Sequence, residues 1–315
     1  MHFFTSEQKT IFRNKIIPIV SSYLFYRNFK IIILKILVTG TSGFVGRYVL
    51  SELLKYQHSI VIAAADISKQ NFPKQNDTVE IKEFNLDFVN SYGNLMDYFN
   101  NPDMLIHIAW KGLPNFNAQI HEEQLTSHCD FIKKLVKNGI KKITVTGTCL
   151  EYGLQEGCLM ETMDIKPSLT YPIAKAELCN FISNLQELHD FEFNWLRLFY
   201  MYGEGQNPKS ILSQLENAIK NNDKIFNMSK GDQQRDYLPI EKVAEYIVKT
   251  ALQNKIKGIV NCCSGKPITI LKLVQDYLDE HKADIKLNLG YFPYPDYEPF
   301  AFYGDAKKLN ASIGN

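Results

Sequence analysis

A tyrosine and a lysine four residues apart are the first pair whose types and spacing could do chemistry. Tyr171 and Lys175 bound the segment YPIAK. Residues four apart share one face of a helix, so both side chains can meet one ligand. A nearby ammonium stabilises a phenolate and lowers the pKa of a tyrosine toward values useful for proton transfer. This spacing also occurs by chance on solvent-facing helices, and the catalytic interpretation gains from Thr148, a hydroxyl at the end of a predicted strand.

A glycine-rich turn is the second candidate. The segment TGTSGFVG runs from Thr39 to Gly46, directly after an apolar strand and ahead of a helical pattern. A pyrophosphate needs backbone N–H groups at close range and a helix N-terminus, and glycines supply the turn and the clearance. Asp66 ends the next apolar strand, where a carboxylate would accept hydrogen bonds from adenosine ribose hydroxyls. A plain strand-to-helix turn is the alternative. The predicted cofactor contacts are Gly40, Ser42, Gly43, Phe44, Val45, Gly46 and Asp66.

The elements that must position these residues alternate between strand and helix. Strands are expected at 36–38, 59–64, 104–109, 142–146, 193–199 and 258–262, and helices at 47–56, 124–137, 210–221, 240–252 and 270–280. Strands separated by helices are typical of parallel βαβ units. The pattern predicts an α/β fold with a Rossmann-type doubly wound parallel sheet. We expect residues 35–190 to form mainly the dinucleotide-binding part, and 191–315 mainly a smaller substrate-binding part interleaved with the sheet.

Composition excludes several functional classes. The chain has 315 residues, 45% of them hydrophobic, which is enough for one large α/β domain. Its 35 Lys+Arg and 34 Asp+Glu leave no surplus charge to attract nucleic acid. The six cysteines form no CxxC pair and the seven histidines no zinc pattern, so we expect no metal site and a reduced, cytoplasmic compartment. Cys262 and Cys263 are interpreted as a strand end and turn.

Residues 1–34 are the compositional exception. The run 16–34 is apolar, but Pro18 lies early in it, and Arg27 and Lys30 interrupt it. Charged groups in hydrocarbon are costly, which argues against a membrane helix. No small-residue cleavage site follows, which argues against a signal peptide. We expect an extra arm, or an upstream start codon, before a domain that begins at Lys35, and no membrane partner.

Six motifs in this order resemble the extended short-chain dehydrogenase/reductases of the NAD-dependent epimerase/dehydratase family, in the branch that acts on nucleotide-activated sugars. The resemblance covers about residues 35 to 313. The matching motifs are TGxxGxxG at 39–46, HIA at 107–109, Thr148 ahead of Tyr152-Gly153, YxxxK at 171–175, LRLF at 196–199 ahead of Tyr202-Gly203, and RDY at 235–237.

The resemblance implies a role for each matching residue. Thr148 and Tyr171 would hold the reacting sugar oxygen, and Lys175 would bind the nicotinamide ribose. Ala109 would lie along the cofactor. Arg235 would pair with the diphosphate of the sugar nucleotide, since a guanidinium matches phosphate bidentately. Asp236 is expected to orient Arg235 or its loop.

Departures from the family pattern narrow the chemistry. Where 4,6-dehydratases carry Asp-Glu after the threonine, this chain has Cys149-Leu150, which cannot do that proton work. Glu151 comes one position late and should point to the other face if the strand continues. Tyr200 replaces an asparagine that contacts substrate in relatives. We therefore expect Cys149 and Tyr200 at the substrate, with a small apolar filler as the alternative for Cys149. Asn85-Leu86 stands near the expected adenine contact.

The sequences of three loops narrow the branch further. HIAWKGLPN, TCLEYG and YPDYEP are similar to reductases that convert dTDP-4-keto-6-deoxyglucose to a 6-deoxyhexose, with dTDP-fucose as product. Trp110 and Pro114 could instead simply close a loop over the sheet edge. The resemblance implies NAD(P)H-dependent reduction at C4, with NAD as cofactor and NADP possible, and a nucleotide-sugar substrate. A homodimer is expected. A 4-epimerase with tightly bound NAD and a non-catalytic cofactor-binding regulator stay open as alternatives.

Overall fold

The computed structural model describes residues 33–68, 72–294 and 298–313. The N-terminal arm predicted at 1–34 lies outside these ranges except for its last two residues. The described residues from Leu34 onward form one compact unit. Within the described ranges, no helix is long and apolar enough to cross a membrane.

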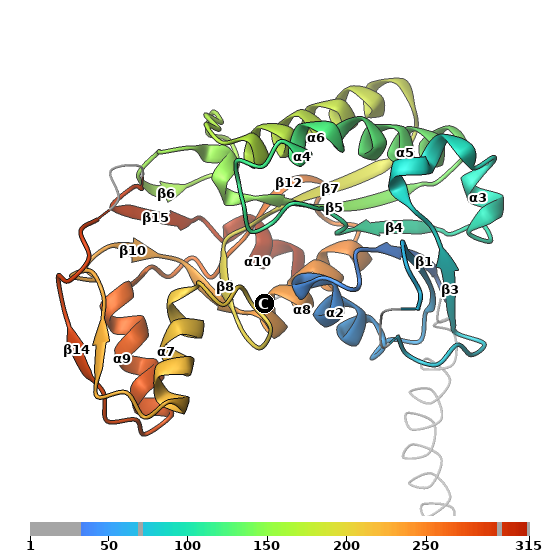
Figure 1. Ribbon diagram of the computed structural model, residues 1–315. Helices are drawn as coiled ribbons and strands as arrows, with labels where there is room; N and C mark the ends of the chain where they lie inside the picture. The colour runs from blue at the N-terminus through green and yellow to red at the C-terminus, as the bar shows by residue number, and fades with distance from the viewer. Residues whose placement is uncertain (1–32, 69–71, 295–297, 314–315) are drawn as a thin grey trace, which may run out of the picture. The chain divides into compact units, whose positions relative to one another are not determined.

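Seven parallel strands form the main sheet, in the order β12-β7-β5-β4-β1-β2-β3 (Figure 1). Lys35 of β1 pairs with Ser59 of β2, and on the other side Ile36 pairs with Met104 of β4. This architecture confirms the predicted doubly wound α/β fold. The strands are β1 (Lys35–Thr39), β2 (Ser59–Ala64), β3 (Val79–Glu83), β4 (Met104–His107), β5 (Lys142–Thr148), β7 (Glu192–Leu198) and β12 (Gly258–Cys262).

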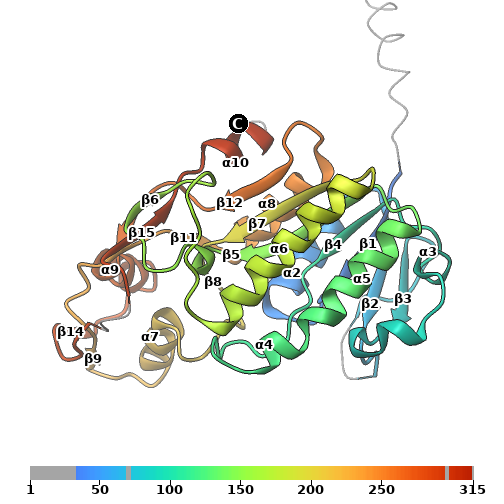
Figure 2. The ribbon, with the colours of Figure 1, turned by 90° about the horizontal axis from the view of Figure 1, so that it is seen from above.

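Helices cover both faces of this sheet, because successive strand residues point to opposite sides. Ile36 and Val38 belong to the core beneath α2 (Phe44–Leu53), α8 (Ile240–Leu252) and α10 (Lys307–Ile313). Leu37 belongs to the opposite core, beneath α3 (Leu95–Tyr98), α5 (Leu125–Lys137) and α6 (Thr170–Leu188). All three side chains are fully buried. Figure 2 shows α5 and α6 crossing the upper face.

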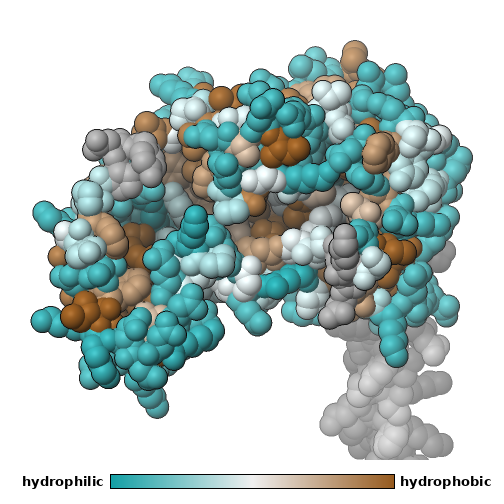
Figure 3. Space-filling view, in the orientation of Figure 1, coloured by the Kyte–Doolittle hydropathy of each residue, from teal (hydrophilic) through white to brown (hydrophobic). Residues whose placement is uncertain are grey.

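The smaller part of the unit is built on short strands. A four-stranded sheet has the order β13-β10-β15-β6, and β11 pairs with β8 and β14 with β9. Helices α7 (Ile211–Lys220) and α9 (Ile270–Glu280) pack against each other around Leu215 and Val274. In Figure 3 the surface is hollowed between this part and the rest. The short strands are β6 (Gly157–Leu159), β8 (Tyr200–Tyr202), β9 (Ile225–Asn227), β10 (Gln234–Arg235), β11 (Tyr237–Pro239), β13 (Ile268–Thr269), β14 (Lys286–Asn288) and β15 (Ala301–Gly304).

Four predicted elements have the observed boundaries: β2, α8, β12 and α9. Others differ where the chain turns toward the cavity described below. The helix expected at 47–56 spans Phe44–Leu53, so its first turn lies within the glycine segment. The strand expected at 104–109 ends at His107, because the next residues leave the sheet. The strand Val79–Glu83 is not predicted by the sequence pattern.

Candidate active site

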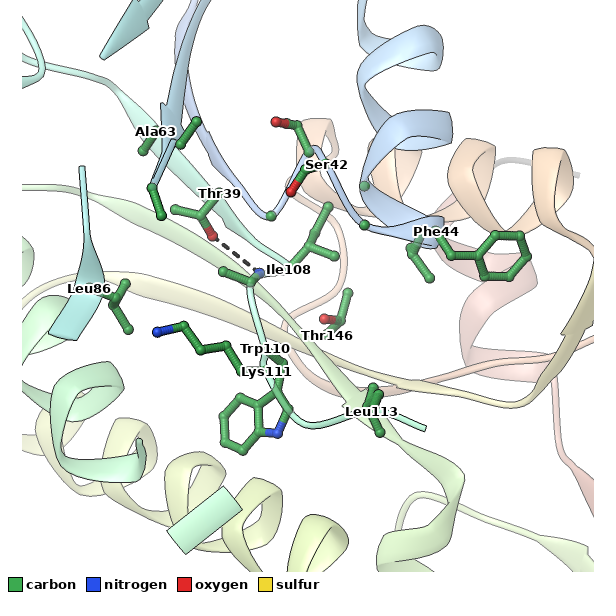
Figure 4. A pocket seen from close by; sticks show the side chains of 18 of the residues that line it. Thr39, Ser42, Phe44, Ala63, Leu86, Ile108, Trp110, Lys111, Leu113 and Thr146 are labelled. Carbon is green, nitrogen blue, oxygen red and sulfur yellow. Dashed lines mark hydrogen bonds between the residues drawn. The ribbon is translucent and has the colours of Figure 1, made fainter. Parts of the chain in front are cut away.

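A cavity of about 420 Å³ lies at the carboxyl ends of the central strands (Figure 4). Parallel α/β sheets bind ligands at this edge, where the strand order reverses. Here the reversal lies between β1 and β4, which are neighbours although distant in sequence. Among the predicted site residues, Gly40, Ser42–Gly46, Ala109, Tyr171 and Lys175 line the cavity.

The glycine turn passes from β1 into α2 within the cavity wall. A Cβ on Gly46 would lie 1.9 Å from the Gly40 carbonyl oxygen, so this position requires glycine for the fold itself. A Cβ on Gly43 would meet only that same oxygen, at the ordinary distance of 3.5 Å. Packing within the protein therefore does not explain a glycine at Gly43, whereas clearance for a ligand does.

Two further observations fit a dinucleotide at this turn. Gly43 is the N-cap of α2 and no side chain caps the helix, so the first N–H groups keep their hydrogen-bonding capacity. The Thr41 hydroxyl is buried and makes no hydrogen bond within the described residues, although it lines the cavity. A buried polar atom without a partner is costly, and a bound ligand would supply one.

Tyr171 and Lys175 lie on the first turns of α6, as the spacing predicts. The Tyr171 N–H donates to the Phe116 carbonyl at 2.9 Å. The Lys175 ammonium donates to the Thr146 carbonyl at 2.8 Å and lies 4.0 Å from the centroid of the Trp110 ring. Both side chains are buried, with 7% of Tyr171 and 1% of Lys175 exposed. Both side chains therefore line the cavity while being largely shielded from solvent.

The expected lowering of the Tyr171 pKa is wrong for this structure. Burial raises the pKa of Tyr171, and Glu151 and Cys149 raise it further, while a hydrogen bond from Thr148 lowers it. Burial also lowers the pKa of Lys175 to about 7, against the opposing effect of Glu151. At neutral pH the lysine thus carries only part of a charge, and the tyrosine is a neutral phenol.

Thr148 ends β5 beside the cavity, and the chain then departs from the predicted path. Residues Cys149–Tyr152 form a 3₁₀ turn instead of continuing the strand, so the condition for Glu151 to point to the other face is not met, and its side chain turns back to the Thr148 N–H. Glu151 is fully buried and accepts the Thr148 N–H at 2.8 Å and the Arg197 Nε at 2.8 Å. This buried ion pair is a feature that sequence reasoning missed, because its partners come from β7.

A chain of hydrogen bonds supports the cavity from below. Thr39 Oγ1 lies 2.8 Å from His107 Nδ1, and His107 Nε2 lies 2.7 Å from His128 Nδ1. His128 Nε2 in turn lies 3.3 Å from Gln124 Oε1. Burial lowers the pKa of His107 to about 3 and that of His128 well below its usual value, so both rings are neutral. Gln124 also bonds both backbone groups of Lys111, at 3.0 Å each, which fixes the cavity-lining loop.

Four predicted substrate contacts, Thr148 among them, lie outside the cavity lining. Cys149 is a buried member of a small apolar cluster, which agrees with the filler alternative. Tyr200 packs against that cluster and lies 5.7 Å from the Arg235 guanidinium, measured to the ring centroid. Arg235 is 2% exposed and bonds Glu298 at 2.9 Å and the Phe300 carbonyl at 3.2 Å. Its guanidinium is therefore committed to protein acceptors here.

Other predicted residues border the site. Asp66 follows Ala63–Ala65 of the cavity lining, and its Oδ1 accepts the Ser68 N–H at 2.9 Å. Asn85 and Leu86 line the cavity, as expected for the region of an adenine. Asp236 was expected to orient either Arg235 or its loop, and the structure shows it bonded to the loop at 264–265. Its carboxylate accepts the N–H groups of Ser264 and Gly265 at 2.7 and 2.8 Å.

Several cavity residues were not among the predicted contacts. Thr41, Phe84, Lys111, Leu113, Thr146 and Leu198 also line the cavity. Most follow the carboxyl end of a strand, and that position is the signal that could have found them. For Trp110, the sequence left open whether it contacts a ligand or only closes a loop over the sheet edge. Its Nε1 donates to His121 Nδ1 at 3.0 Å, and the ring lines the cavity.

Metal and thiol chemistry have no visible centre in the described part of the chain. No group of three or more His, Cys, Asp or Glu side chains there could hold a metal ion. All six cysteines are free, and Cys262 ends β12 with Cys263 in the following turn, as predicted.

Comparisons with known proteins agree with this geometry. The family model described as "NAD dependent epimerase/dehydratase family" matches residues 36–263. The chain is 30% identical to dTDP-6-deoxy-L-talose 4-dehydrogenase (NAD(+)) of Aggregatibacter actinomycetemcomitans, over 86% of this chain and 99% of that protein. It is 24% identical to dTDP-4-dehydro-6-deoxyglucose reductase of Escherichia coli, over 81% of this chain and 84% of that protein.

A solved structure shares the fold. This is the UDP-N-acetylglucosamine 4-epimerase from Methanobrevibacter ruminantium M1 in complex with UDP-N-acetylmuramic acid. The TM-score is 0.77 at 20% identity, covering 90% of this chain and 92% of that one. At this identity the likeness concerns the fold alone.

The different surroundings of Gly43 and Gly46 give a matched pair of substitutions. Gly43 has φ −77° and ψ 171°, which alanine adopts freely, so Gly43→Ala should change the free energy of unfolding by less than about 0.5 kcal/mol. Its methyl group would occupy the ligand clearance and weaken NAD binding about tenfold or more, roughly 1.4 kcal/mol. Gly46→Ala should instead destabilise the fold. Urea unfolding and calorimetric titration with NAD measure both, and normal NAD affinity in Gly43→Ala would contradict the assignment.

Proposed function

Because the chain belongs to the NAD dependent epimerase/dehydratase family, we propose that it reduces the C4 keto group of a nucleotide-activated 4-keto-6-deoxyhexose with NADH. The nucleotide is proposed to be dTDP. One observation carries the proposal: the two curated relatives described above are named for oxidation and reduction at C4 of dTDP-linked 6-deoxyhexoses. A 4-dehydrogenase and a 4-ketoreductase interconvert an alcohol and a ketone in opposite directions.

The cavity offers the groups that NAD would need. The uncapped start of α2 and the clearance at Gly43 would hold the pyrophosphate, and Thr41 would gain a partner. Asn85 and Leu86 would border the adenine, Asp66 the adenosine ribose and Lys175 the nicotinamide ribose. When bound, the nicotinamide supplies the hydride that reduces the carbonyl carbon.

The protein's part in the reaction is to stabilise and protonate the oxygen at C4. Tyr171 donates its phenolic proton to the developing alkoxide, and Thr148 donates a second hydrogen bond. The raised pKa of Tyr171 suits this role, since a donor must hold its proton until the alkoxide forms. Lys175 positions the cofactor ribose and supplies a partial positive charge beside the forming anion.

The surroundings of Cys149 argue against dehydration of the sugar. Burial raises the pKa of this thiol, and Glu151 raises it further. The thiol therefore stays protonated and cannot serve as the base of an elimination. Leu150 beside it has no titratable group at all.

The substrate's diphosphate is proposed to interact with Arg235. The guanidinium lies beside Tyr200 of β8, and the Arg235 backbone in β10 pairs with Phe302 of β15. In this structure its anionic partner is Glu298, whose side chain is 41% exposed. A diphosphate would replace that carboxylate, exchanging one charge-assisted pair for another.

A panel of substrates tests the proposal. The purified protein with NADH should consume dTDP-4-keto-6-deoxyglucose, seen as loss of absorbance of the reduced nicotinamide and as a 6-deoxyhexose in the NMR spectrum. Conversion of dTDP-glucose or UDP-glucose without net change in NADH would instead identify the 4-epimerase. No conversion of any nucleotide sugar, with NAD still bound, would favour the regulator.

Replacing Tyr171 by Phe should lower kcat by about 10²-fold or more, because it removes the proton donor. The ring contacts with Phe116 and His121 remain, so NAD affinity should hold. Tyr98→Phe is the matched control: it removes a hydroxyl that donates to the Glu83 carbonyl, and Tyr98 itself does not line the cavity. Near-normal turnover in Tyr171→Phe would exclude the proposed donor.

NADH should be preferred over NADPH, because a carboxylate at Asp66 repels a 2′-phosphate. Arg47, directly after the third glycine of the turn, could neutralise that phosphate, but its guanidinium donates to the Glu204 carbonyl. Lys69, three residues beyond Asp66, could do the same, but it lies outside the described residues. We expect kcat/KM for NADH to exceed that for NADPH by about tenfold. Asp66→Asn keeps an acceptor for the Ser68 N–H and should lower the ratio of kcat/KM for NADH to that for NADPH. A preference of the unaltered protein for NADPH would contradict the role of Asp66.

A further inference from the structure

The end of β5 holds an ammonium and a carboxylate on adjacent peptide groups. The Thr146 carbonyl accepts the Lys175 ammonium at 2.8 Å, and the Thr148 N–H donates to Glu151 Oε1 at 2.8 Å. Gly147 lies between them. A Cβ there would come within 2.5 Å of Glu151 Oε1, so glycine is needed for the carboxylate to reach this position.

Glu151 is held from the other side by β7. Trp195 Nε1 donates to Oε1 at 3.0 Å, and Arg197 Nε donates to Oε2 at 2.8 Å. The side chains of Glu151 and Arg197 are 0% and 3% exposed. Burial raises the pKa of Glu151, whereas Arg197 and the N–H groups of Thr148 and Trp195 lower it. A buried carboxylate held by three fixed donors cannot reorient, so it has a defined place beside Thr148.

The charge of Glu151 acts on the residues proposed for catalysis. It raises the pKa of Tyr171, in the same direction as burial, and it raises the pKa of Lys175, against burial. In both cases the protonated form is favoured. The charged and titratable groups that face Glu151 are Arg197 on β7, Cys149 on the 3₁₀ turn, and Tyr171, Lys175 and Cys179 on α6.

We propose that Glu151 is a positioning residue for the reaction: it fixes Thr148 through the backbone and holds a negative charge at the end of β5, one peptide group from the carbonyl that accepts the Lys175 ammonium. This charge favours giving a proton to a ketone oxygen over taking one from an alcohol. The direction of reaction rests on the proposed function, whereas the effect on protonation does not. The competing interpretation is that Glu151 serves only as the counterion of Arg197.

Titration of Lys175 separates the two interpretations without any substrate. In the full-length protein labelled with ¹³C at lysine Cε, the resonance missing from Lys175→Met identifies this residue. It should titrate near pH 7 in the unaltered protein. In Glu151→Gln it should titrate at lower pH, because the amide no longer stabilises the ammonium.

Glu161→Gln is the matched control. Glu161 also accepts a backbone N–H, that of Asn261 at 2.9 Å, and its charge acts on Lys308 rather than on Lys175. This variant should leave the Lys175 titration in place. An unshifted titration in Glu151→Gln would overturn the proposal.

Two further variants address folding, since Glu151→Gln leaves Arg197 buried without its counterion. Glu151→Gln combined with Arg197→Gln removes both charges and should show the same lowered titration. Glu151→Asp keeps the charge and should restore the titration toward pH 7. A counterion role alone predicts no shift in the double variant.

Kinetics then test the direction of reaction. For ketone reduction, kcat should fall as pH rises through the Lys175 pKa, about 7 in the unaltered protein, and in Glu151→Gln this fall should begin at lower pH. An unchanged profile would overturn the effect on Lys175. A shifted Lys175 titration in a protein that reduces no 4-keto sugar would refute the proposed function alone, while an unshifted titration in an active reductase would refute the role of Glu151 alone.

Discussion

Parallel strands can be joined only by crossovers, so the main sheet delivers the carboxyl ends of all seven strands to one edge. Between β1 and β4 the connections run in opposite directions, and the cavity opens at that point. The glycine turn follows β1, Trp110 follows β4 and Thr146 lies near the end of β5. Distance along the chain therefore matters little to the site, because position at a strand end decides which residues meet.

Burial decides the chemistry of the groups collected there. Removal from water disfavours every charge, so the phenol of Tyr171 stays neutral and Lys175 gives up part of its charge. Burial raises the pKa of the Glu151 carboxyl as well, and its partner Arg197 opposes this by lowering it. An anion beside Thr148 opposes the loss of the lysine's charge and reinforces the tyrosine's hold on its proton. The protonation of the site thus depends on β5 and β7 as much as on α6.

Local patterns predicted six of the seven strands of the main sheet, the glycine turn and the helical placing of Tyr171 and Lys175, because each depends on residues close together along the chain. The buried ion pair was not predictable in this way. It requires the strand to end at Thr148 and Arg197 to approach from β7, and neither follows from alternation of polar and apolar residues. The expected effect of Lys175 on Tyr171 failed for a related reason: spacing along a helix says nothing about burial. The Glu298 partner of Arg235 is likewise a contact between distant segments.

The histidine chain beneath the cavity has a consequence for how this wall can vary. With neutral rings and an acceptor at Gln124, every hydrogen bond from Thr39 through His107 and His128 has one allowed direction. Replacement of a single member by an apolar residue leaves its neighbour as a buried donor or acceptor without a partner, which destabilises the fold. Replacement of the whole set by apolar residues can leave the free energy of unfolding nearly unchanged. These positions should therefore be substituted together in evolution. Redesign of the loop that Gln124 holds would likewise have to replace all the hydrogen-bonded side chains at once.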